Sequence, residues 1–434
     1  MSKMNRRNFI EKTAISAAGI SIIPRHVLGG KGFIAPSDRI QLGYIGTGKQ
    51  VYTLLNEIGK CKETVVIAAS DVYKRKLTSF VDAANKINQK KAINTSIKTY
   101  HKYRELLENK EVDAVVIATP DHWHAQNVID AAKAGKDIYC EKPLALTVSE
   151  GRAMVDATRK YERVFQTGNM QRSWRDFRQT VELIQNGYIG EVKEINVSVG
   201  EPVKQCDLPS QLIPEDLDWN EWIGPSLYRG FHEDLVPADI NGPWAWWRGY
   251  RGFGGGMITD WGAHMFDIAQ WAMQKDGSGP VQLLPPEIPN QTHGLSMVYD
   301  NGVKVNHKLW GGEDDKNAIQ FIGSEGKIEV SRNYLRTFPD KGLAKKDLKN
   351  ADQKVYFSDN HYQDWIDAIK NRIKPVSDVA IGHSTSAVCN IANIAYELQR
   401  PLNWNAKTEK FEGDEGANML LDRPYRGKWN YKDF

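Results

Sequence analysis

Cysteine is scarce in this 434-residue sequence and is not arranged for cross-links or metals. The four cysteines lie far apart, at positions 61, 140, 206 and 389, and none forms a CxxC pair or a Cys/His ligand pattern. Isolated cysteines of this kind are typical of small buried apolar residues. The sequence therefore excludes a disulfide-dense scaffold and a zinc knuckle, and we expect no bound metal.

The net charge is also low, at +3 for the whole chain. Residues 1–38 hold six basic and two acidic side chains, which is a local charge of +4, so residues 39–434 sum to −1. A body so close to neutral lacks the positive charge that neutralises nucleic-acid phosphates, and we expect no nucleic-acid partner. Apolar residues make up 41% of the chain, which is enough for two large domains.

Near the N-terminus there is an apolar run, but it is too short to cross a membrane. Residues 13–23 number eleven, whereas a bilayer span needs about 20. Arg6 and Arg7 precede Phe9 and this run, an order that resembles a twin-arginine export signal. The alternative is an amphipathic first helix, but the apolar side chains would surround such a helix instead of forming a stripe. We expect export by this route to the periplasm and no stable membrane span apart from the signal, if it is retained. No clean AxA cleavage site follows, so removal of the signal stays open.

A nucleotide-binding pattern begins at residue 39. The strand-like run 39–45 ends in Gly46-Thr47-Gly48 and is followed by a helical stretch at 51–58. This order of strand, tight turn and helix is the one that a dinucleotide site requires, because glycine backbone N–H groups approach a pyrophosphate at a helix N-terminus. Further apolar runs at 64–70 and 112–118 complete a βαβαβ unit.

Asp71 follows the second strand, 25 residues after Gly46. A carboxylate there accepts hydrogen bonds from a ribose and repels a 2′-phosphate, so it favours NAD over NADP. Lys74 and Arg75 weaken that preference. Val51 stands where the third glycine of GxGxxG belongs, which is a departure from the usual motif.

Two further segments end near the expected cofactor. His122 and His124, in Asp121-His122-Trp123-His124, do not share a helix face, so we expect packing near the cofactor and not a metal pair. Lys142 ends the apolar run 137–140 in Glu141-Lys142-Pro143, at the carboxyl end of a predicted strand, where doubly wound sheets bind ligands.

The Gly46-Thr47-Gly48 turn, the Ala118-Thr119-Pro120 segment and above all Glu141-Lys142-Pro143 resemble the Gfo/Idh/MocA oxidoreductases. The resemblance runs from about residue 39 to the C-terminus, and it implies an N-terminal Rossmann domain that binds NAD. The predicted cofactor-binding residues are Gly46, Thr47, Gly48, Asp71, Thr119, Pro120, His122, His124, Glu141 and Lys142.

From residue 165 the pattern changes to that of an α+β domain. Residues 192–199 alternate like a half-buried strand, and 296–309 and 319–330 each have a central turn typical of a hairpin, so we expect a large, mainly antiparallel sheet. Apolar spacing predicts helices at 364–372 and 385–398, and an irregular arm from 405 that packs or dimerises. The predicted organisation is an export signal and linker at 1–38, a Rossmann domain at 39–164 and a substrate-binding domain at 165–434.

Residues 254–273 begin with a run of three glycines and continue in an apolar helical pattern that contains Asp260, His264 and Asp267. At about 100° per residue these three side chains lie on one helix face, which indicates either a buried polar network or a catalytic site. The Gfo/Idh/MocA resemblance implies that Lys142, Asp260 and His264 are catalytic. His264 would then be the base for a secondary hydroxyl, Asp260 would fix its tautomer, and Lys142 would hold the alkoxide.

Substrate contacts are predicted from residues near these segments. The candidates are Gln171, Arg172, Trp247, Arg248 and Asp267. The tryptophans between 219 and 247 either stack on a sugar ring or belong to the core. We expect a small carbohydrate substrate and a homo-oligomer.

The resemblance leaves three functions open. The first is NAD-dependent oxidation of a sugar or polyol. The second is a glycoside hydrolase or lyase that oxidises a ring hydroxyl transiently, eliminates the glycosidic group and returns the hydride. The third, of a different class, is a non-catalytic carbohydrate-binding protein, which would be expected to lose the Lys142, Asp260 and His264 set.

Overall fold

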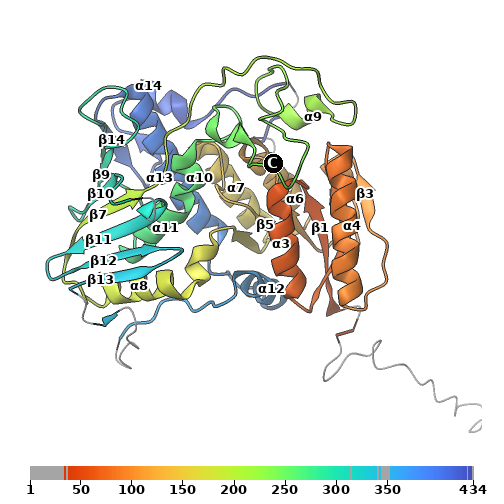
Figure 1. Ribbon diagram of the computed structural model, residues 1–434, viewed down its shortest axis with the longest axis horizontal. Coiled ribbons are helices and arrows are strands. Elements are labelled where there is room, and N and C mark those ends of the chain that lie inside the picture. The colour runs from red at the N-terminus through yellow and green to blue at the C-terminus, as the bar shows by residue number, and fades with distance from the viewer. Residues whose placement is uncertain are drawn as a thin grey trace, which may run out of the picture.

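The computed structural model describes residues 34–35, 38–312, 315–339, 342–343, 352–427 and 429–432. Two sheets lie side by side with helices packed between and around them (Figure 1). The predicted export signal lies outside the described residues. Within the described ranges, no helix is both long and apolar enough to cross a membrane.

The smaller sheet is the predicted parallel one. Its six strands run in the order β3-β2-β1-β4-β5-β6, and every neighbouring pair is parallel. Its strands are β1 (Ile40–Ile45), β2 (Thr64–Ser70), β3 (Lys98–Tyr100), β4 (Ala114–Ile117), β5 (Asp137–Cys140) and β6 (Phe165–Thr167). The central strands β2, β4 and β5 are buried along their whole length, as expected for a parallel sheet covered on both faces.

Helices cover both faces of this sheet. One face packs against α3 (Lys49–Lys60), α4 (Lys74–Lys90) and α12 (His361–Asn371). The other face packs against α5 (Tyr103–Leu107), α6 (His124–Lys133) and α7 (Val148–Lys160). This is the doubly wound arrangement predicted from the sequence, and it brings the loops that follow β1, β2, β4 and β5 to one edge of the sheet.

The division between the two halves differs from the predicted boundary at 164/165. Strand β6 (Phe165–Thr167) pairs in parallel with β5 and so extends the first sheet. Helix α12 comes from the far end of the sequence, yet its Trp365 is fully buried against the first sheet. A strand of three residues has too short a pattern to be assigned from sequence, and the return of α12 is a tertiary contact.

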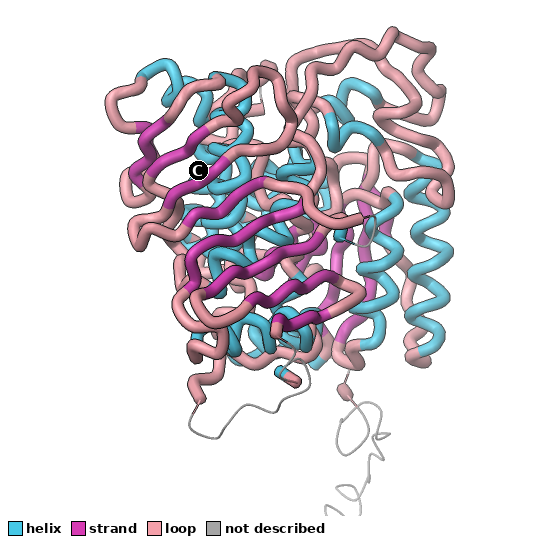
Figure 2. The backbone as a smooth tube through the Cα atoms, turned by 60° about the vertical axis from the view of Figure 1, so that its left-hand side comes forward, coloured by secondary structure: helices cyan, strands magenta, loops and turns pink. Residues whose placement is uncertain are grey.

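The larger sheet has nine strands in the order β13-β12-β11-β7-β10-β9-β8-β14-β15, and it fills the front of Figure 2. Its strands are β7 (Val192–Ser198), β8 (Gln282–Leu284), β9 (Ser296–Val298), β10 (Lys304–His307), β11 (Ala318–Gly323), β12 (Lys327–Ser331), β13 (Leu335–Phe338), β14 (Leu402–Asn405) and β15 (Lys410–Phe411). Both predicted hairpins, β9–β10 and β11–β12, are confirmed as antiparallel. The β7–β10 pair is parallel, so the sheet is mixed but mainly antiparallel.

Three helices bury the inner face of the larger sheet. They are α8 (Arg175–Gln185), α11 (Gly262–Ala272) and α13 (Val379–Leu398), and they form the largest apolar cluster with β7, β11 and β12. The sequence predicted α13 only from residue 385. It begins six residues earlier because the Asp378 side chain caps it by accepting a hydrogen bond from the Ala380 backbone N–H.

The C-terminal arm is partly regular and packs on its own chain. It contains β15, α14 (Glu415–Asn418) and a short 3₁₀ turn at Met419–Leu421. Beyond these, the Arg423 guanidinium lies 2.7 Å from a carboxylate oxygen of Glu150 in α7. Arg426 donates to the Asn220 side chain at 2.7 Å, in α9 (Trp219–Ile223). The arm therefore connects α7 to α9, at the start of the tryptophan-rich segment (residues 219–247).

Candidate active site

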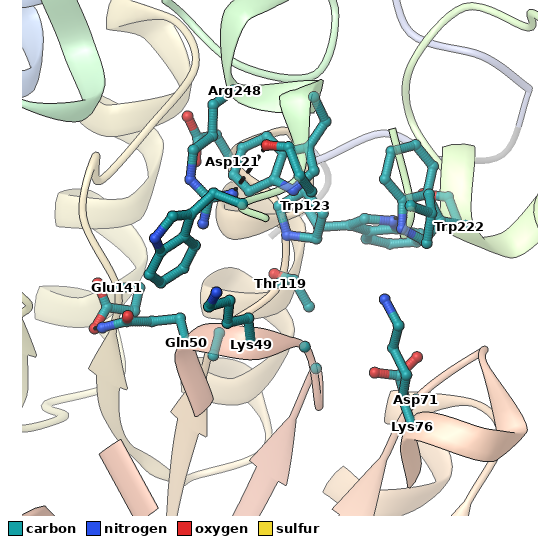
Figure 3. Close-up of a pocket in the computed structure, with 18 of the residues that line it drawn as sticks. Lys49, Gln50, Asp71, Lys76, Thr119, Asp121, Trp123, Glu141, Trp222 and Arg248 are labelled. Atoms are coloured by element: carbon teal, nitrogen blue, oxygen red, sulfur yellow. Dashed lines mark hydrogen bonds between the residues drawn. The ribbon is translucent and has the colours of Figure 1, made fainter. Parts of the chain in front are cut away.

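A cavity of about 680 Å³ lies at the carboxyl ends of the parallel strands. One wall comes from the loops after β1, β2, β4 and β5, and the other from segment 235–248, from α10 (Met257–Asp260) and from α11. Figure 3 shows Asp71 and Lys76 on one side of this space and Glu141 with Gln50 on the opposite side. The cavity thus joins both halves of the chain at the place where an open α/β sheet binds its ligand.

The glycine turn lets a ligand come close to the protein backbone. Gly46 has a φ of 87°, and a Cβ there would lie 2.8 Å from the Thr119 backbone nitrogen. A side chain at this position is therefore excluded by both conformation and space. A Cβ on Gly48 would meet no atom within 4 Å, and Gly48 lines the cavity. This open cradle at the start of α3 (Lys49–Lys60) fits the pyrophosphate of a dinucleotide.

Asp71 lies next to the glycine turn, as the ribose-binding prediction requires. Its carboxylate accepts hydrogen bonds from the Thr47 backbone N–H at 2.6 Å and from the Thr47 hydroxyl at 2.7 Å. Its other oxygen accepts from the Tyr73 backbone N–H at 2.8 Å. Asp71 thus fixes the loop around Thr47 as well as lining the cavity.

Two lysines that were not predicted also line this end. Lys49 donates to the Gly242 carbonyl at 2.5 Å, and its ammonium lies 5.1 Å from the centroid of the Trp244 ring. This contact holds the tryptophan-rich segment against the start of α3. Lys76 lies beside Asp71 (Figure 3), and burial lowers the pKa of its ammonium. A cation beside Asp71 is available to either NAD or NADP, so these contacts do not distinguish the two cofactors.

At the other end of the cavity, Lys142 and Asp260 form an ion pair. The Lys142 ammonium donates to the Asp260 carboxylate at 2.8 Å and to the Asp260 carbonyl at 2.9 Å. Burial works against the charged form of Asp260, but Lys142 and then Arg248 outweigh it and lower its pKa. The structure therefore corrects the expected role of Asp260: its carboxylate holds Lys142, and no hydrogen bond joins it to His264 within the described part of the chain.

His264 is 2% exposed and lines the cavity. Burial, followed by the positive charges of Lys142 and Arg332, lowers the pKa of its imidazole well below the usual value. The ring is therefore neutral at physiological pH. Its Nδ1 is buried and has no hydrogen-bond partner among the described residues. A neutral imidazole beside a lysine is suited to accept a proton.

The single helix predicted to hold Asp260, His264 and Asp267 is interrupted. Helix α10 ends at Asp260, Trp261 lies between the helices, and α11 begins at Gly262. Asp260 and His264 both reach the cavity, whereas Asp267 is directed elsewhere. A helical wheel assumes one continuous helix, so it could not show this break.

Asp267 and Arg172 form a buried ion pair outside the cavity lining. The Arg172 guanidinium donates to both carboxylate oxygens of Asp267 at 2.8 Å, and it also pairs with Asp276 at 2.7 Å. The Thr385 hydroxyl donates to Asp267 at 2.9 Å. These contacts favour a structural role for Arg172 and Asp267 over the predicted substrate contact, because each satisfies the other's buried charge.

Of the remaining substrate candidates, one lies outside the cavity lining and two line the cavity. Gln171 is buried behind the cavity wall, where its amide contacts the Met265 sulfur at 3.9 Å. Trp247 and Arg248 do line the cavity. The Arg248 Nε lies 3.6 Å from the Asp260 carboxylate, and its guanidinium stacks over the Trp247 ring.

The two histidines predicted near the cofactor are buried outside the cavity lining. His122 Nε2 lies 3.0 Å from the Trp222 carbonyl, and burial lowers its pKa to about 3. His124 lies between the Pro143 carbonyl at 2.8 Å and the Thr119 carbonyl at 3.0 Å. His124 thus supports the two strand-end loops, and neither histidine lines the cavity. Thr119, Pro120 and Glu141 do line the cavity.

Asp121 and Arg332 also line the cavity and were not predicted from the sequence. Asp121 is 3% exposed, and burial together with the nearby Asp260 raises the pKa of its carboxyl well above the usual range and so disfavours its charged form. Arg332 follows β12 and reaches the cavity from the larger sheet. Asp121 directly precedes His122 in the segment Asp121-His122-Trp123-His124, so its position next to a predicted site could have indicated it. Arg332 belongs to no motif.

Comparisons with known proteins agree with this architecture. Residues 40–169 match the family model described as oxidoreductase family, NAD-binding Rossmann fold. Residues 191–431 match the model of the oxidoreductase family C-terminal alpha/beta domain. A myo-inositol 2-dehydrogenase from Thermotoga maritima is 28% identical over 351 residues, which cover 78% of this chain and 88% of that protein.

Other relatives match less of the chain or share the fold alone. A glycosyl hydrolase family 109 protein from Shewanella baltica is 27% identical over 208 residues, which are 44% of this chain and 45% of that protein. An aldose-aldose oxidoreductase from Caulobacter crescentus has a TM-score of 0.57 at 17% identity, over 84% of this chain and 99% of that one. The two matched family models together span most of the sequence, and the chain therefore belongs to the Gfo/Idh/MocA oxidoreductase family, with an NAD-binding Rossmann domain followed by the family's C-terminal α/β domain.

Proposed function

We propose that this protein oxidises a secondary hydroxyl of a sugar, glycoside or polyol and passes the hydride to a tightly held NAD. The observation that carries the proposal is the placement of Lys142, paired with Asp260, beside the neutral His264 in the same cavity as the glycine turn. The myo-inositol 2-dehydrogenase relative, which the chain matches over most of its length, supports a polyhydroxylated substrate.

The chain's own residues would hold the dinucleotide along one wall of the cavity. Gly46 and Gly48 leave room for the pyrophosphate, and Asp71 is placed to accept hydrogen bonds from a ribose. Thr119 and Glu141 line the same wall nearer to Lys142. When bound, the nicotinamide supplies the hydride acceptor.

His264 and Lys142 would act on the substrate hydroxyl. The neutral His264 imidazole receives the hydroxyl proton, and the Lys142 ammonium stabilises negative charge on the substrate oxygen. Asp260 positions Lys142 through two contacts, one from its carboxylate and one from its carbonyl. The side chains of Lys142 and Asp260 are only 15% and 13% exposed, which limits solvent screening of their charges.

Aromatic side chains form the opposite wall of the cavity. Trp222, Trp244, Trp246 and Trp247 line it, and Trp244 and Trp246 remain 48% and 59% exposed. Flat aromatic faces beside polar groups are suited to stacking on the apolar faces of sugar rings. These residues support the assignment of a carbohydrate substrate.

The test begins with the purified protein. Denaturation should release a dinucleotide whose mass identifies it as NAD or NADP. A panel of hexoses, inositols and methyl glycosides is then mixed with the NAD-loaded protein, and absorbance at the wavelength of reduced nicotinamide is followed in a single turnover. Tight dinucleotide binding with no hydride transfer from any member of the panel would contradict the proposed oxidation.

A second candidate is net glycoside hydrolysis through transient oxidation, which the glycosyl hydrolase family 109 relatives favour. Here a ring hydroxyl is oxidised, the acidified neighbouring C–H loses its proton and the glycosidic group leaves. Water then adds to the resulting double bond, and the hydride returns to the ring carbonyl. Release of nitrophenol from nitrophenyl glycosides without net reduction of NAD would select this reaction, whereas stoichiometric reduction would select simple oxidation.

We also infer that the protein is exported by the twin-arginine route and assembles as a homo-oligomer. This route carries folded proteins, so it is compatible with loading of the cofactor before export. Changing Arg6 and Arg7 together to lysine should leave the folded protein in the cytoplasm, and undiminished export would contradict the inference. Light scattering of the purified protein tests the oligomeric state.

A further inference from the structure

Arg332 is a charged residue in the cavity whose role the oxidation chemistry does not explain. It lies in the turn between β12 (Lys327–Ser331) and β13 (Leu335–Phe338) of the larger sheet. It lines the cavity together with Lys142, Asp260 and His264. The pairing of β12 with β13 fixes the two ends of this turn.

The guanidinium of Arg332 is held in a defined orientation. Its Cζ lies over the Trp261 ring at 4.4 Å and over the Trp174 ring at 5.2 Å, measured to the ring centroids. The second of these contacts comes from the residue that precedes α8. Its Nη2 donates a long hydrogen bond of 3.4 Å to the Gln171 amide oxygen. A guanidinium that lies over aromatic rings can still donate bidentate hydrogen bonds to a carboxylate or a phosphate.

Within the described residues, Arg332 forms no ion pair with a carboxylate, in contrast to the other arginines nearby. Arg172 pairs with two aspartates. Arg248 lies 3.6 Å from Asp260, which is already paired with Lys142. An arginine in a ligand cavity that lacks an acidic partner is more consistent with ligand binding than with support of the fold.

The charges around Arg332 leave this end of the cavity positive. Lys142, Arg248 and Arg332 are three cations, and Asp260 and Glu141 are at most two negative charges. Burial raises the pKa of Glu141, which disfavours the charged form of its carboxyl.

Two other titratable groups line this end. The lowered pKa of His264 keeps its imidazole neutral, and burial, followed by the charge of Asp260, raises the pKa of Asp121 and disfavours its charged form. An oxidised nicotinamide ring carries an additional positive charge. A negative charge on the substrate would neutralise this excess.

We propose that Arg332 binds an anionic group of the substrate, a carboxylate or a phosphate, so that the site takes acidic sugars in preference to neutral ones. This inference rests on the proposed function, because it assumes that the cavity binds a sugar. Arg332 is then a residue that determines specificity, and Lys142 and His264 act on the hydroxyl. A charge-assisted bidentate contact should strengthen binding of an acidic sugar by about 10- to 100-fold over its neutral counterpart.

The experiment uses the full chain loaded with NAD and measures binding by calorimetry, so it does not depend on turnover. The probes are methyl glycosides of glucuronic, galacturonic and mannuronic acid, the parent methyl hexosides, and the corresponding 6-phosphates. The variants are Arg332→Gln and Arg332→Lys. The matched control is Arg336→Gln, because Arg336 belongs to β13, lies outside the cavity lining and pairs with Asp315.

The wild type and the Arg336→Gln control should bind at least one acidic probe about tenfold or more tightly than its neutral parent. Arg332→Gln should remove that preference and leave affinity for the neutral hexoside within about twofold, and Arg332→Lys should retain part of it. A preference for uronates over 6-phosphates, or the reverse, identifies the anionic group.

Equal affinity for acidic and neutral probes in the wild type overturns the inference, as does failure of every acidic probe to bind. Loss of NAD in Arg332→Gln also overturns it, since the guanidinium would then serve the dinucleotide. These outcomes are distinct from failure of the proposed function. In that case acidic probes bind and respond to Arg332, but no sugar reduces the bound NAD.

Discussion

The Lys142 ammonium lies 2.8 Å from the Asp260 carboxylate, and this contact joins the end of strand β5 to the end of helix α10. The two residues are 118 positions apart in the sequence. The contact crosses from the Rossmann domain to the C-terminal domain, so it makes the position of Lys142 depend on both.

The first prediction concerns this pair. Lys142→Met should abolish hydride transfer, because the substrate oxygen loses its cationic partner, and it should leave the Asp260 carboxylate without its closest counter-charge. Asp260→Asn should keep the fold but lower turnover by about 10- to 100-fold, since Lys142 is no longer held by a charged partner. Single-turnover reduction of NAD and thermal unfolding measure both effects. Arg251→Gln, which breaks an exposed pair with Glu397, is the control. Normal hydride transfer in Lys142→Met would refute its catalytic role.

The second prediction concerns His264. His264→Ala should reduce turnover by about 10² to 10⁴ with the dinucleotide still bound, as expected for loss of a general base. Because burial lowers the pKa of His264, the imidazole stays neutral as the pH falls through 6.5. The acidic limb of the rate profile of the wild type should therefore lie below pH 6.5. A large fall in melting temperature with near-normal hydride transfer would show a structural role instead.

The third prediction concerns cofactor choice at Asp71. Asp71→Asn keeps one acceptor oxygen for Thr47 but removes the charge that would repel a 2′-phosphate. The ratio of NAD to NADP affinity should fall by about tenfold, and titration with each dinucleotide measures it. Thr47→Ala is a control for loosening of the loop and should weaken both cofactors alike. A wild type that already prefers NADP would refute the role given to Asp71.

The fourth prediction tests the structural role of Arg172 in its ion pair with Asp267. Arg172→Met leaves Asp267, which is 1% exposed, as an uncompensated buried charge, and should lower the free energy of unfolding by about 3 to 5 kcal/mol. Denaturant unfolding measures this loss. The double variant Arg172→Met with Asp267→Leu should recover part of it, because no charge is then stranded. If Arg172→Met instead raises the substrate KM at unchanged stability, the residue contacts substrate after all.

The fifth prediction concerns stability at acidic pH. Burial lowers the pKa of His307 to about 4 and that of His361 to about 3. Below pH 6.5 these side chains take up protons in the unfolded state before they do so in the native state, so stability falls as the pH falls from 6.5 toward 4. Melting temperature should drop steadily over this interval. His361→Gln, which can still donate a hydrogen bond to the Thr167 carbonyl, should flatten the pH dependence.

Much of the first domain was predictable because its signals are local. The Gly46-Thr47-Gly48 turn, the position of Asp71 and the end of β5 at Lys142 each depend on a strand and the loop directly after it. Parallel strands that are buried on both faces have continuous apolar runs, and their carboxyl ends meet at one edge of the sheet. The hairpins β9–β10 and β11–β12 were predictable for the same reason, since each turn lies within its own segment.

The sequence by itself thus determined the doubly wound sheet, the glycine turn, the main hairpins and the catalytic candidates Lys142 and His264. Only the tertiary structure decided which charges meet. It paired Asp260 with Lys142, paired Asp267 with Arg172, placed His122 and His124 behind the cavity wall, and brought Arg332 into the cavity. The physical reason is that a buried charge requires a partner. In these two pairs the partners are 118 and 95 positions apart, where neither helical periodicity nor local spacing can indicate them.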